Sequence, residues 1–375
     1  MRERALRQLK EGDFILVLLV LGLSVFGIVM VFSASYYNAL SKFGNPYKYL
    51  IEDSMWVLVG WVGFVFFSFF DYHYLRHFAW PLLGAGMALL FLIFTPLGLT
   101  INNATRWLDF KYFTVMPGEV VKFSLIIFVA AFLSEDPTRS RKFFKGILPT
   151  LTVAGICFAA IYKQPNLSTA GLVLLLVVGM LYVAGLPKIW VTATAIAGAA
   201  LASLAVLAPG GEYRLQRVIS FMDPFQDPLG SGYQVVQSLL ALGSGGVFGV
   251  GLGQSIQKTL YLPEPQNDFI LAIIGEELGF VGILGLMAAY LGLIWRCCHI
   301  AVRAKDYFGM MLAAGTTIIL SLQVLMNIAV VTASFPPTGV ILPFVSQGGN
   351  AMVIFLSLMG IMTNISRQAA PSRQL

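Results

Sequence analysis

The chain has 375 residues, of which 58% are hydrophobic and only 11% are charged. Because soluble domains carry roughly 25% charged residues, this composition excludes a soluble protein and predicts one membrane domain that covers residues 1–375. The net charge of +6 does not indicate nucleic-acid binding, because no run of Lys or Arg alternates with aromatic residues.

Ten apolar stretches are long enough to be transmembrane helices, which need about 20 apolar residues to cross roughly 30 Å of hydrocarbon. The first follows a basic N-terminus and is longer than the ~7–15-residue apolar core of a signal peptide, so we expect it to be retained. In chain order, the stretches cover residues 13–35, 53–70, 78–95, 117–134, 144–162, 167–185, 188–208, 269–296, 308–333 and 348–366. We therefore predict an all-α polytopic integral membrane protein with ten transmembrane helices.

The basic residues predict the orientation of these helices. An even number of spans places both termini on one side of the membrane, and 15 of the 24 Lys and Arg residues fall on that side. The loops on the other side are longer but contain fewer bases. The positive-inside rule therefore predicts cytoplasmic termini.

Two histidines, His73 and His77, precede the third span. Their spacing of four residues suits a metal, but no third ligand accompanies them on this short cytoplasmic turn. A structural role is the better interpretation.

The fourth span begins with an acid and a base. Glu119 and Lys122 are three residues apart and so share a helical face, and Pro117 suits the first turn of a helix. The pair either neutralises itself so that the helix can enter lipid, or contacts a substrate. Just upstream, Arg106 and Trp107 could anchor the chain at headgroup depth, or the Arg could hold a lipid phosphate.

A segment of about sixty residues, 209–268, separates the seventh and eighth spans and is predicted to be a large extracytoplasmic loop. It is too polar to span the membrane, and its many apolar residues favour packing on the bundle over disorder. The glycines of 243–253 indicate close backbone packing or a re-entrant turn, because no strand precedes them as a nucleotide site would need. Three bases of the loop, Arg214, Arg217 and Lys258, could neutralise a diphosphate.

Asp268 stands where this loop meets the eighth span. A carboxylate there either caps the helix or accepts a proton as a general base. Glu276 and Glu277, two turns deeper, are predicted to be buried and hydrogen-bonded, and Gln323 and Asn327 to form hydrogen bonds between helices.

The motifs of this region fall into specific blocks. The most specific block contains Tyr213-Arg214, Arg217, Phe221, Asp227-Pro228, Gly232-Tyr233-Gln234, Gln237-Ser238, Gly243-Ser244-Gly245-Gly246, Ser255, Gln257-Lys258, Pro263-Glu264, Asp268-Phe269 and Gly275-Glu276-Glu277-Leu278-Gly279. Supporting blocks are Arg106-Trp107, Pro117 with Glu119 and Lys122, Gln164 to Thr169, Pro336 to Gly339 and Leu342 to Gly349. Through these blocks nearly the whole chain resembles the SEDS family (shape, elongation, division and sporulation), that is, the FtsW/RodA/SpoVE proteins. The run 261–265 is more similar to the FtsW/SpoVE branch than to RodA.

The chain departs from the family pattern at Gly118, Asn166, Ser168, Gln266, Asn267 and Gln347. It keeps Asp268, Glu119 and Lys122, so these departures question the subgroup more than the activity.

The resemblance implies a peptidoglycan glycosyltransferase that serves cell division, elongation or sporulation. Such an enzyme lies in the bacterial cytoplasmic membrane and polymerises lipid II into glycan strands at the outer face, with a class B penicillin-binding protein as partner. The family's essential loop acid corresponds to Asp268, and a divalent cation (Mg²⁺ or Mn²⁺) but no organic cofactor is expected. The residues predicted to bind substrate are Arg106, Trp107, Glu119, Lys122, Arg214, Arg217, Lys258 and Ser346.

Two other functions remain open from the residues. A transporter of the lipid-linked precursor would place its site near the bilayer midplane with paired broken helices, whereas these candidates lie at the outer face. A non-catalytic scaffold for the penicillin-binding protein would not need Asp268. We therefore favour the enzyme.

Overall fold

The computed structural model describes residues 12–101, 104–111, 113–207, 221–228, 230 and 232–369. Within these residues, eight helical segments are long and apolar enough to cross a membrane, as predicted for a polytopic membrane protein. They are α2 (Phe14–Phe43), α3 (Lys48–Phe69), η1 (Tyr72–Tyr74) with α4 (Leu75–Leu92), α5 (Pro117–Glu135), η3 (Phe143–Ile147) with α6 (Leu148–Tyr162), α11 (Ile270–Arg303), α12 (Tyr307–Val331) and α13 (Gly349–Ala369).

Two further helices, α7 (Leu167–Val183) and α8 (Lys188–Leu207), lie at the predicted sixth and seventh spans. With 17 residues, α7 is at the lower limit for a transmembrane helix. Each predicted span thus contains a helix, although the count of ten crossings stays a prediction. The largest differences in length are in α2 and α11, which run beyond residues 35 and 296.

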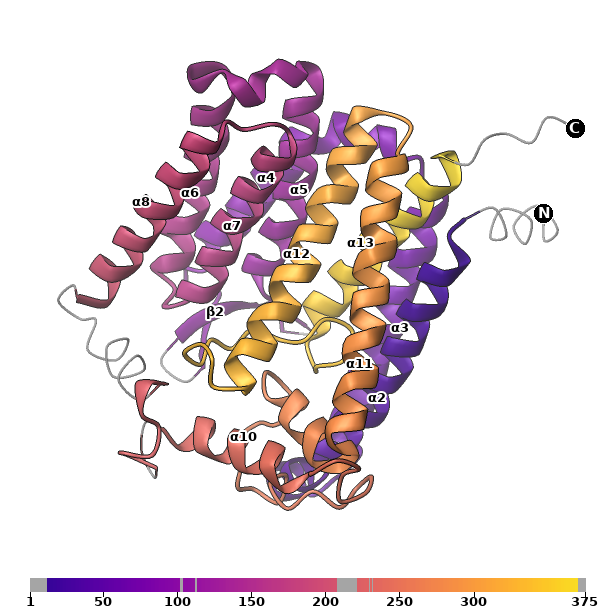
Figure 1. Ribbon diagram of the computed structural model, residues 1–375, viewed down its shortest axis with the longest axis vertical. Coiled ribbons are helices and arrows are strands. Elements are labelled where there is room, and N and C mark those ends of the chain that lie inside the picture. The colour runs from indigo at the N-terminus through magenta and orange to yellow at the C-terminus, as the bar shows by residue number, and fades with distance from the viewer. Residues whose placement is uncertain are drawn as a thin grey trace, which may run out of the picture.

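The start of α2 and the end of α13, the first and last described helices, lie on the same face of the bundle, which we call the terminal face. The backbone N–H of Asp13, just before α2, donates to Ser366 Oγ of α13 at 3.1 Å. The short connections 70–74, 136–147 with η2 (Pro137–Arg141), 184–187 and 304–306 lie on this face. At the opposite end, the loop face, are α10 (Tyr233–Ser244) and the longer connections (Figure 1). This arrangement agrees with an even number of crossings.

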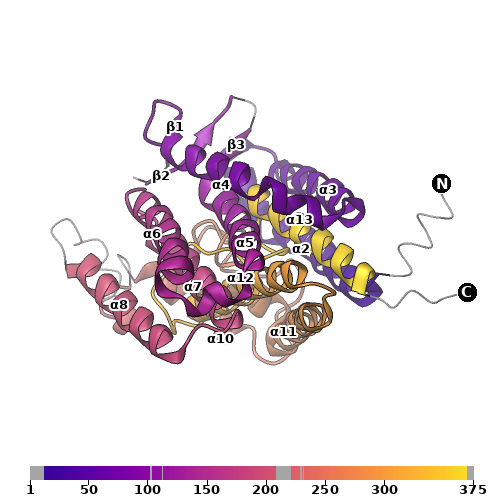
Figure 2. The same cartoon turned by 90° about the horizontal axis from the view of Figure 1, so that it is seen from above.

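Small residues allow close helix packing in the bundle. A Cβ at Gly63 of α3 would lie 2.6 Å from Ser357 Oγ of α13, and one at Gly360 would clash with the carbonyl oxygen of Phe64. Figure 2 shows α13 alongside α3. In a bilayer, close van der Waals contact of this kind stabilises helix association in place of the hydrophobic effect.

A small antiparallel sheet on the loop face was not predicted. It has the order β1-β2-β3, from β1 (Gly98–Ile101), β2 (Ala104–Asp109) and β3 (Thr114–Val115). The all-α prediction missed it because these strands are too short for their β-branched residues to form a clear alternating pattern. Asn350 Nδ2 of α13 donates to the Thr114 carbonyl at 3.0 Å, which ties the sheet to the bundle.

The described part of the large loop packs on the bundle, as predicted. On α10, Ser238 Oγ donates to the Val331 carbonyl of α12 at 2.8 Å, and Val235 and Val236 are buried. The glycine-rich run that follows also packs closely, because a Cβ at Gly245 would overlap the Gly275 carbonyl of α11.

The same glycine-rich run interrupts α11 at Gly279, whose φ of 69° favours glycine. There the N–H groups of Phe280 and Val281 leave the helical pattern and donate to the carbonyls of Gly246 and Val247 at 2.9 and 3.1 Å. The carbonyls they release, those of Glu276 and Glu277, accept from Val250 N and Gly251 N at 2.9 and 3.0 Å. The loop thus replaces the hydrogen bonds that the helix loses.

Candidate active site on the loop face

Asp268 is a half-buried residue immediately before α11. The N-cap position of α11 is Phe269, whose own side chain makes no capping hydrogen bond. Asp268 thus stands one residue before the N-cap position of α11. Its backbone carbonyl accepts from Asn327 Nδ2 at 2.8 Å, and its Oδ2 atom lies 3.8 Å from where a Cβ on Gly339 would stand.

The first turn of α5 holds the predicted acid and base together. Lys122 Nζ donates to Glu119 Oε1 at 2.7 Å, and the two residues are only 2% and 5% exposed. Glu119 Oε2 has no hydrogen-bond partner among the described residues. One carboxylate oxygen is therefore committed to the lysine and the other is left to accept a hydrogen bond.

Helix α12 packs against α5 and also contacts Asp268. A Cβ at Gly315 would lie 3.0 Å from Ile126 of α5. From this contact, Glu119 is seven residues nearer the loop face along α5, and Gln323 is eight residues nearer it along α12. Because both helices rise by about 1.5 Å per residue, Glu119 and Gln323 lie at a similar distance from the loop face. One turn beyond, Asn327 donates to Asp268. This helix therefore sets the position of the α5 pair relative to the loop acid.

Arg106 and Trp107 lie on β2, and both are half-buried. The Arg106 guanidinium donates to the carbonyl oxygen of Pro165, just before α7. Asn166 then caps α7, with its Oδ1 accepting from Thr169 N at 3.3 Å. The sheet thus places Arg106 beside the α6–α7 connection on the loop face.

Lys258 lies in a buried ion pair. Its Nζ is 2.7 Å from Glu277 Oε1 of α11 and 2.9 Å from Ser33 Oγ of α2, and Lys258 and Glu277 are 3% and 0% exposed. Ser33 also donates to Glu277 at 2.7 Å. Glu277 neutralises the charge of the Lys258 ammonium. The three side chains together join the loop to α2 and α11.

Glu276 is hydrogen-bonded to the loop, as predicted for a buried acid. It accepts from Ile256 N and Gln257 N at 2.9 and 3.3 Å, and from the Ser255 hydroxyl. Ser33 was not singled out from the sequence, and Ser255 was named only as part of a family block. An isolated Ser carries no pattern that would reveal a partner on a distant segment.

Ser346 is buried in the turn before α13, where its Oγ accepts from Leu342 N at 2.9 Å. The next residue, Gln347, donates its N–H to the Gln266 carbonyl at 2.9 Å. Ser346 therefore supports a turn that contacts the Asp268 loop. Arg214 and Arg217 lie outside the described residues.

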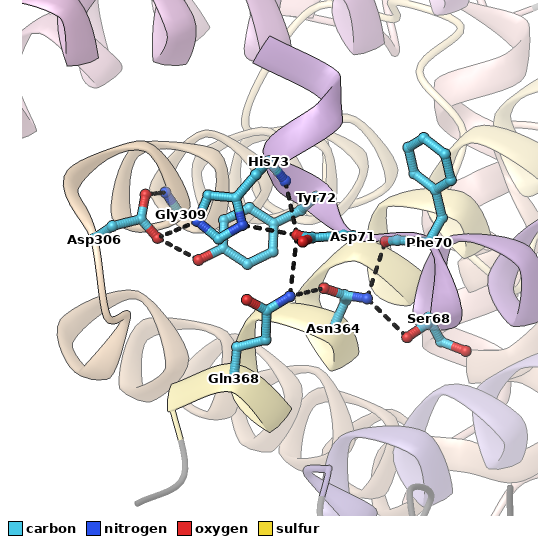
Figure 3. A network of polar contacts seen from close by, with 9 residues as sticks. All are labelled: Ser68, Phe70, Asp71, Tyr72, His73, Asp306, Gly309, Asn364 and Gln368. Atoms are coloured by element: carbon cyan, nitrogen blue, oxygen red, sulfur yellow. Dashed lines mark hydrogen bonds and ion pairs between the residues drawn. The ribbon is translucent and has the colours of Figure 1, made fainter. Parts of the chain in front are cut away.

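His73 has the structural role predicted for it, on the terminal face (Figure 3). Its Nδ1 is 2.7 Å from Asp71 Oδ1 and its Nε2 is 3.4 Å from Asp306 Oδ1, the cap of α12. Gln368 of α13 also donates to Asp71, at 3.2 Å. Partial desolvation raises the pKa of Asp71, but the hydrogen bonds from His73 and Gln368 outweigh it and hold the pKa below its usual value.

A second carboxylate on the terminal face is also stabilised as the anion. Hydrogen bonds from the hydroxyl and N–H of Thr138 and from Lys142 lower the pKa of Asp136 to about 2. In the described part of the chain no three His, Cys, Asp or Glu side chains are grouped so that they could hold a metal ion.

Comparison with known proteins shows what the chain is similar to. Residues 14–370 match the model of a family described as cell cycle protein, FtsW/RodA/SpoVE. The chain is 36% identical to a probable peptidoglycan glycosyltransferase FtsW of Geobacter sp. (strain M18), over 96% of this chain and 98% of the relative. It is 37% identical to the stage V sporulation protein E of Bacillus subtilis (strain 168), over 95% and 97%.

Solved structures give the same result. A chain from a study of the structural coordination of polymerization and crosslinking by a peptidoglycan synthase complex superposes with a TM-score of 0.79 at 28% identity, over 96% of this chain and 99% of that one. The rod shape determining protein RodA of Thermus thermophilus superposes with a TM-score of 0.71 at 25% identity, over 96% and 98%.

Proposed function

We infer the function from the premise that the chain belongs to the SEDS family of FtsW, RodA and SpoVE: it is a membrane peptidoglycan glycosyltransferase of cell division or sporulation. Beyond that, we propose that it polymerises lipid II into glycan strands at the outer face of the cytoplasmic membrane. The observation that carries this proposal is the position of Asp268, a half-buried acid on the loop face immediately before α11.

The proposed chemistry needs few groups. Joining two lipid-linked sugars requires that an acceptor hydroxyl lose a proton while a diphosphate leaves. Asp268 takes that proton as general base, a role that typically contributes about 10²–10⁴-fold to rate. The lipid tails of both substrates hold the sugars at interface depth, so the enzyme has only to orient them.

Cationic groups on the same face offset the charge of the departing diphosphate. Lys122 is oriented for this by Glu119 at 2.7 Å, and Arg106 is held at the loop face by Pro165. Arg214 and Arg217 are the remaining candidates, and Trp107 packs beside the lipid-linked substrate. Fixed charges of this kind stabilise charge that develops in the transition state.

Lys258 and Ser346 take part in substrate binding through the loops they hold. Their side chains are buried, and their polar atoms are engaged with Glu277 and with Leu342 N. Lys258 binds Glu277, which follows Asp268 in the chain, and Ser346 supports the turn in which Gln347 contacts Gln266, which precedes it.

A divalent cation, Mg²⁺ or Mn²⁺, remains part of the proposal, whereas no organic cofactor is included. The described residues do not supply a protein cage for such an ion. Mg²⁺ is often bound through one or two carboxylates and substrate phosphates, so we propose that the ion arrives with the lipid diphosphate. No step of the mechanism above passes through it.

We propose a class B penicillin-binding protein as the partner, which would crosslink the strands that this chain makes. The superposition on a chain of a peptidoglycan synthase complex supports this proposal. Lipid II, the growing glycan strand and membrane lipids are the other molecules that the chain would contact.

The experiment is a polymerisation assay with purified protein and lipid II, with and without the partner, and with an inhibitor of the other polymerase family present. We expect the parent to make glycan strands and Asp268→Asn to be at least ~100-fold slower. Glu264→Gln is the matched control, because Glu264 is an exposed acid of the same loop, paired with Lys42 at 3.3 Å.

Two results would contradict the proposal in different ways. Equal rates for parent and Asp268→Asn would show that the base is another group. Absence of strands from the parent, together with movement of lipid II across vesicle membranes, would favour the transporter, and binding of the partner without either activity would favour the scaffold.

A further inference from the structure

Asn327 joins the two loop segments that surround the proposed base. It lies near the loop-face end of α12 and is 0% exposed. Its Nδ2 atom donates to the Asp268 carbonyl at 2.8 Å and to the Val340 carbonyl at 2.8 Å. A single side-chain amide therefore connects the end of the large loop, at Asp268, to residues 332–348 between α12 and α13.

The orientation of this amide is fixed by its partners. Both hydrogens of Nδ2 are used on backbone carbonyls, and Oδ1 accepts no hydrogen bond from the described residues. The flipped amide would bring Oδ1 against two carbonyl oxygens and leave Nδ2 without acceptors. The side chain can therefore hold both segments in only one way.

The segment that Asn327 holds through Val340 also lies beside the carboxylate. Gly339, the preceding residue, has a φ of 71°, and a Cβ there would lie 3.8 Å from Asp268 Oδ2. Asn327 thus holds the backbone of Asp268 from one side and the turn beside its carboxylate from the other. Movement of either segment would change where the carboxylate lies.

Helix α12 extends this support to the α5 pair. Its contact between Gly315 and Ile126 fixes it against α5, which carries Glu119 and Lys122. Through Asn327, the backbone of Asp268 is therefore bonded to the same helix that packs on α5, which carries the proposed phosphate-binding Lys122.

We propose that Asn327 is a positioning residue for glycosyl transfer, which holds Asp268 at its working distance from the α5 pair. The inference rests on the proposed function. Asn327 acts through the backbone of Asp268 and the Gly339 turn, without touching the substrate. Because a displacement of about 1 Å can cost up to 10²-fold in rate, its loss lowers kcat and leaves the KM for lipid II nearly unchanged.

The chain offers a matched control at the other end of the bundle. Asn364 of α13 is also buried, and its Nδ2 also donates to two backbone carbonyls, those of Ser68 and Phe70, at 2.9 Å each. It lies on the terminal face (Figure 3). Asn327→Ala and Asn364→Ala each remove two bonds from an amide to backbone carbonyls, and Asn364→Ala also removes the bond that Asn364 Oδ1 accepts from Gln368 at 2.9 Å. Only Asn327 is beside Asp268.

The test measures kcat and KM for lipid II polymerisation, per folded molecule, for the parent, Asn327→Ala, Asn327→Asp and Asn364→Ala. We expect kcat to fall at least tenfold in both Asn327 variants with KM within about twofold, and both constants to stay near the parent's in Asn364→Ala. If Asn327→Ala does not fold, Asn327→Ser, which keeps one donor, takes its place.

The outcomes separate the inference from its premise. Equal losses of kcat in the Asn327 and Asn364 variants, or a rise in KM without a fall in kcat at Asn327, would overturn the positioning role. A parent that polymerises while Asp268→Asn keeps full activity would instead overturn the proposed base.

Discussion

At the scale of single residues, the sequence revealed polar pairs that are local in the chain and missed those that are distant. Glu119 and Lys122 were paired from their spacing, because residues three apart on a helix are neighbours. The ion pair of Lys258 with Glu277 joins a loop residue to a helix residue 19 positions later in the chain, so no periodic pattern could reveal it. Asn327 was predicted to contact a helix, but its two partners are loop carbonyls.

Asp53 of α3 is the exception to this pairing of buried charges. It is 1% exposed, and neither carboxylate oxygen has a hydrogen-bond partner among the described residues. A buried carboxylate without a partner destabilises the folded state. We therefore expect Asp53→Asn to raise the free energy of unfolding by about 1–3 kcal/mol.

Thermal unfolding in detergent would measure this effect. Glu119→Gln serves as the comparison and should lower the unfolding temperature, because it leaves the buried ammonium of Lys122 without its partner at 2.7 Å. A lower unfolding temperature for Asp53→Asn would show that the carboxylate stabilises the fold through a bound group.

At the scale of elements, the apolar stretches located the helices because lipid requires long, uniformly apolar segments. The same patterns could not reveal the interruption of α11 at Gly279. That interruption depends on the exchange of backbone hydrogen bonds with residues 246–251, for which the sequence shows only an excess of glycine. The sheet that carries Arg106 was missed for a related reason. Its short strands are stabilised by hydrogen bonds to neighbouring strands, and their sequences show no clear alternation of apolar and polar residues.

The terminal-face network of Figure 3 gives a prediction about pH. The η1 turn is joined to α12 by His73 and Asp306, and to α13 by Asp71 and Gln368. Because the pKa of Asp71 is lower in the folded chain than its ordinary 3.8, the anion stabilises the fold above that pH, and the contribution disappears as pH falls through the folded-state pKa.

Chemical unfolding of the parent and Asp71→Asn across a pH series would test this expectation. The parent should be the more stable of the two near neutral pH, and the difference should shrink as pH falls below about 4. Asp109→Asn, an exposed acid on the loop face, provides the control. A difference that persists unchanged at pH 3 would show that the charge of Asp71 does not hold the network.

At the scale of the whole molecule, the start of α2 and the end of α13 lie together because the helices alternate in direction between two faces. Arg296 of α11 forms an ion pair with Asp13 at 2.5 Å, so a base near the end of one helix fixes the start of the first. The even number of spans predicted this shared face. The unequal distribution of Lys and Arg between the two faces predicts which face is cytoplasmic. The packing of the helices does not determine this orientation.

Labelling with a thiol reagent that cannot cross membranes would establish the orientation. Cys157 and Cys297 are buried and Cys298 is exposed, so Cys298→Ser provides a background with little reactivity. On it, Asn45→Cys tests the exposed α2–α3 turn of the loop face and Thr138→Cys the exposed η2 turn of the terminal face. In intact spheroplasts we expect only Asn45→Cys to react, with Thr138→Cys reacting after permeabilisation. The reverse pattern would place Asp268 in the cytoplasm, on the wrong side of the membrane for the outer-leaflet lipid II that the proposed reaction uses.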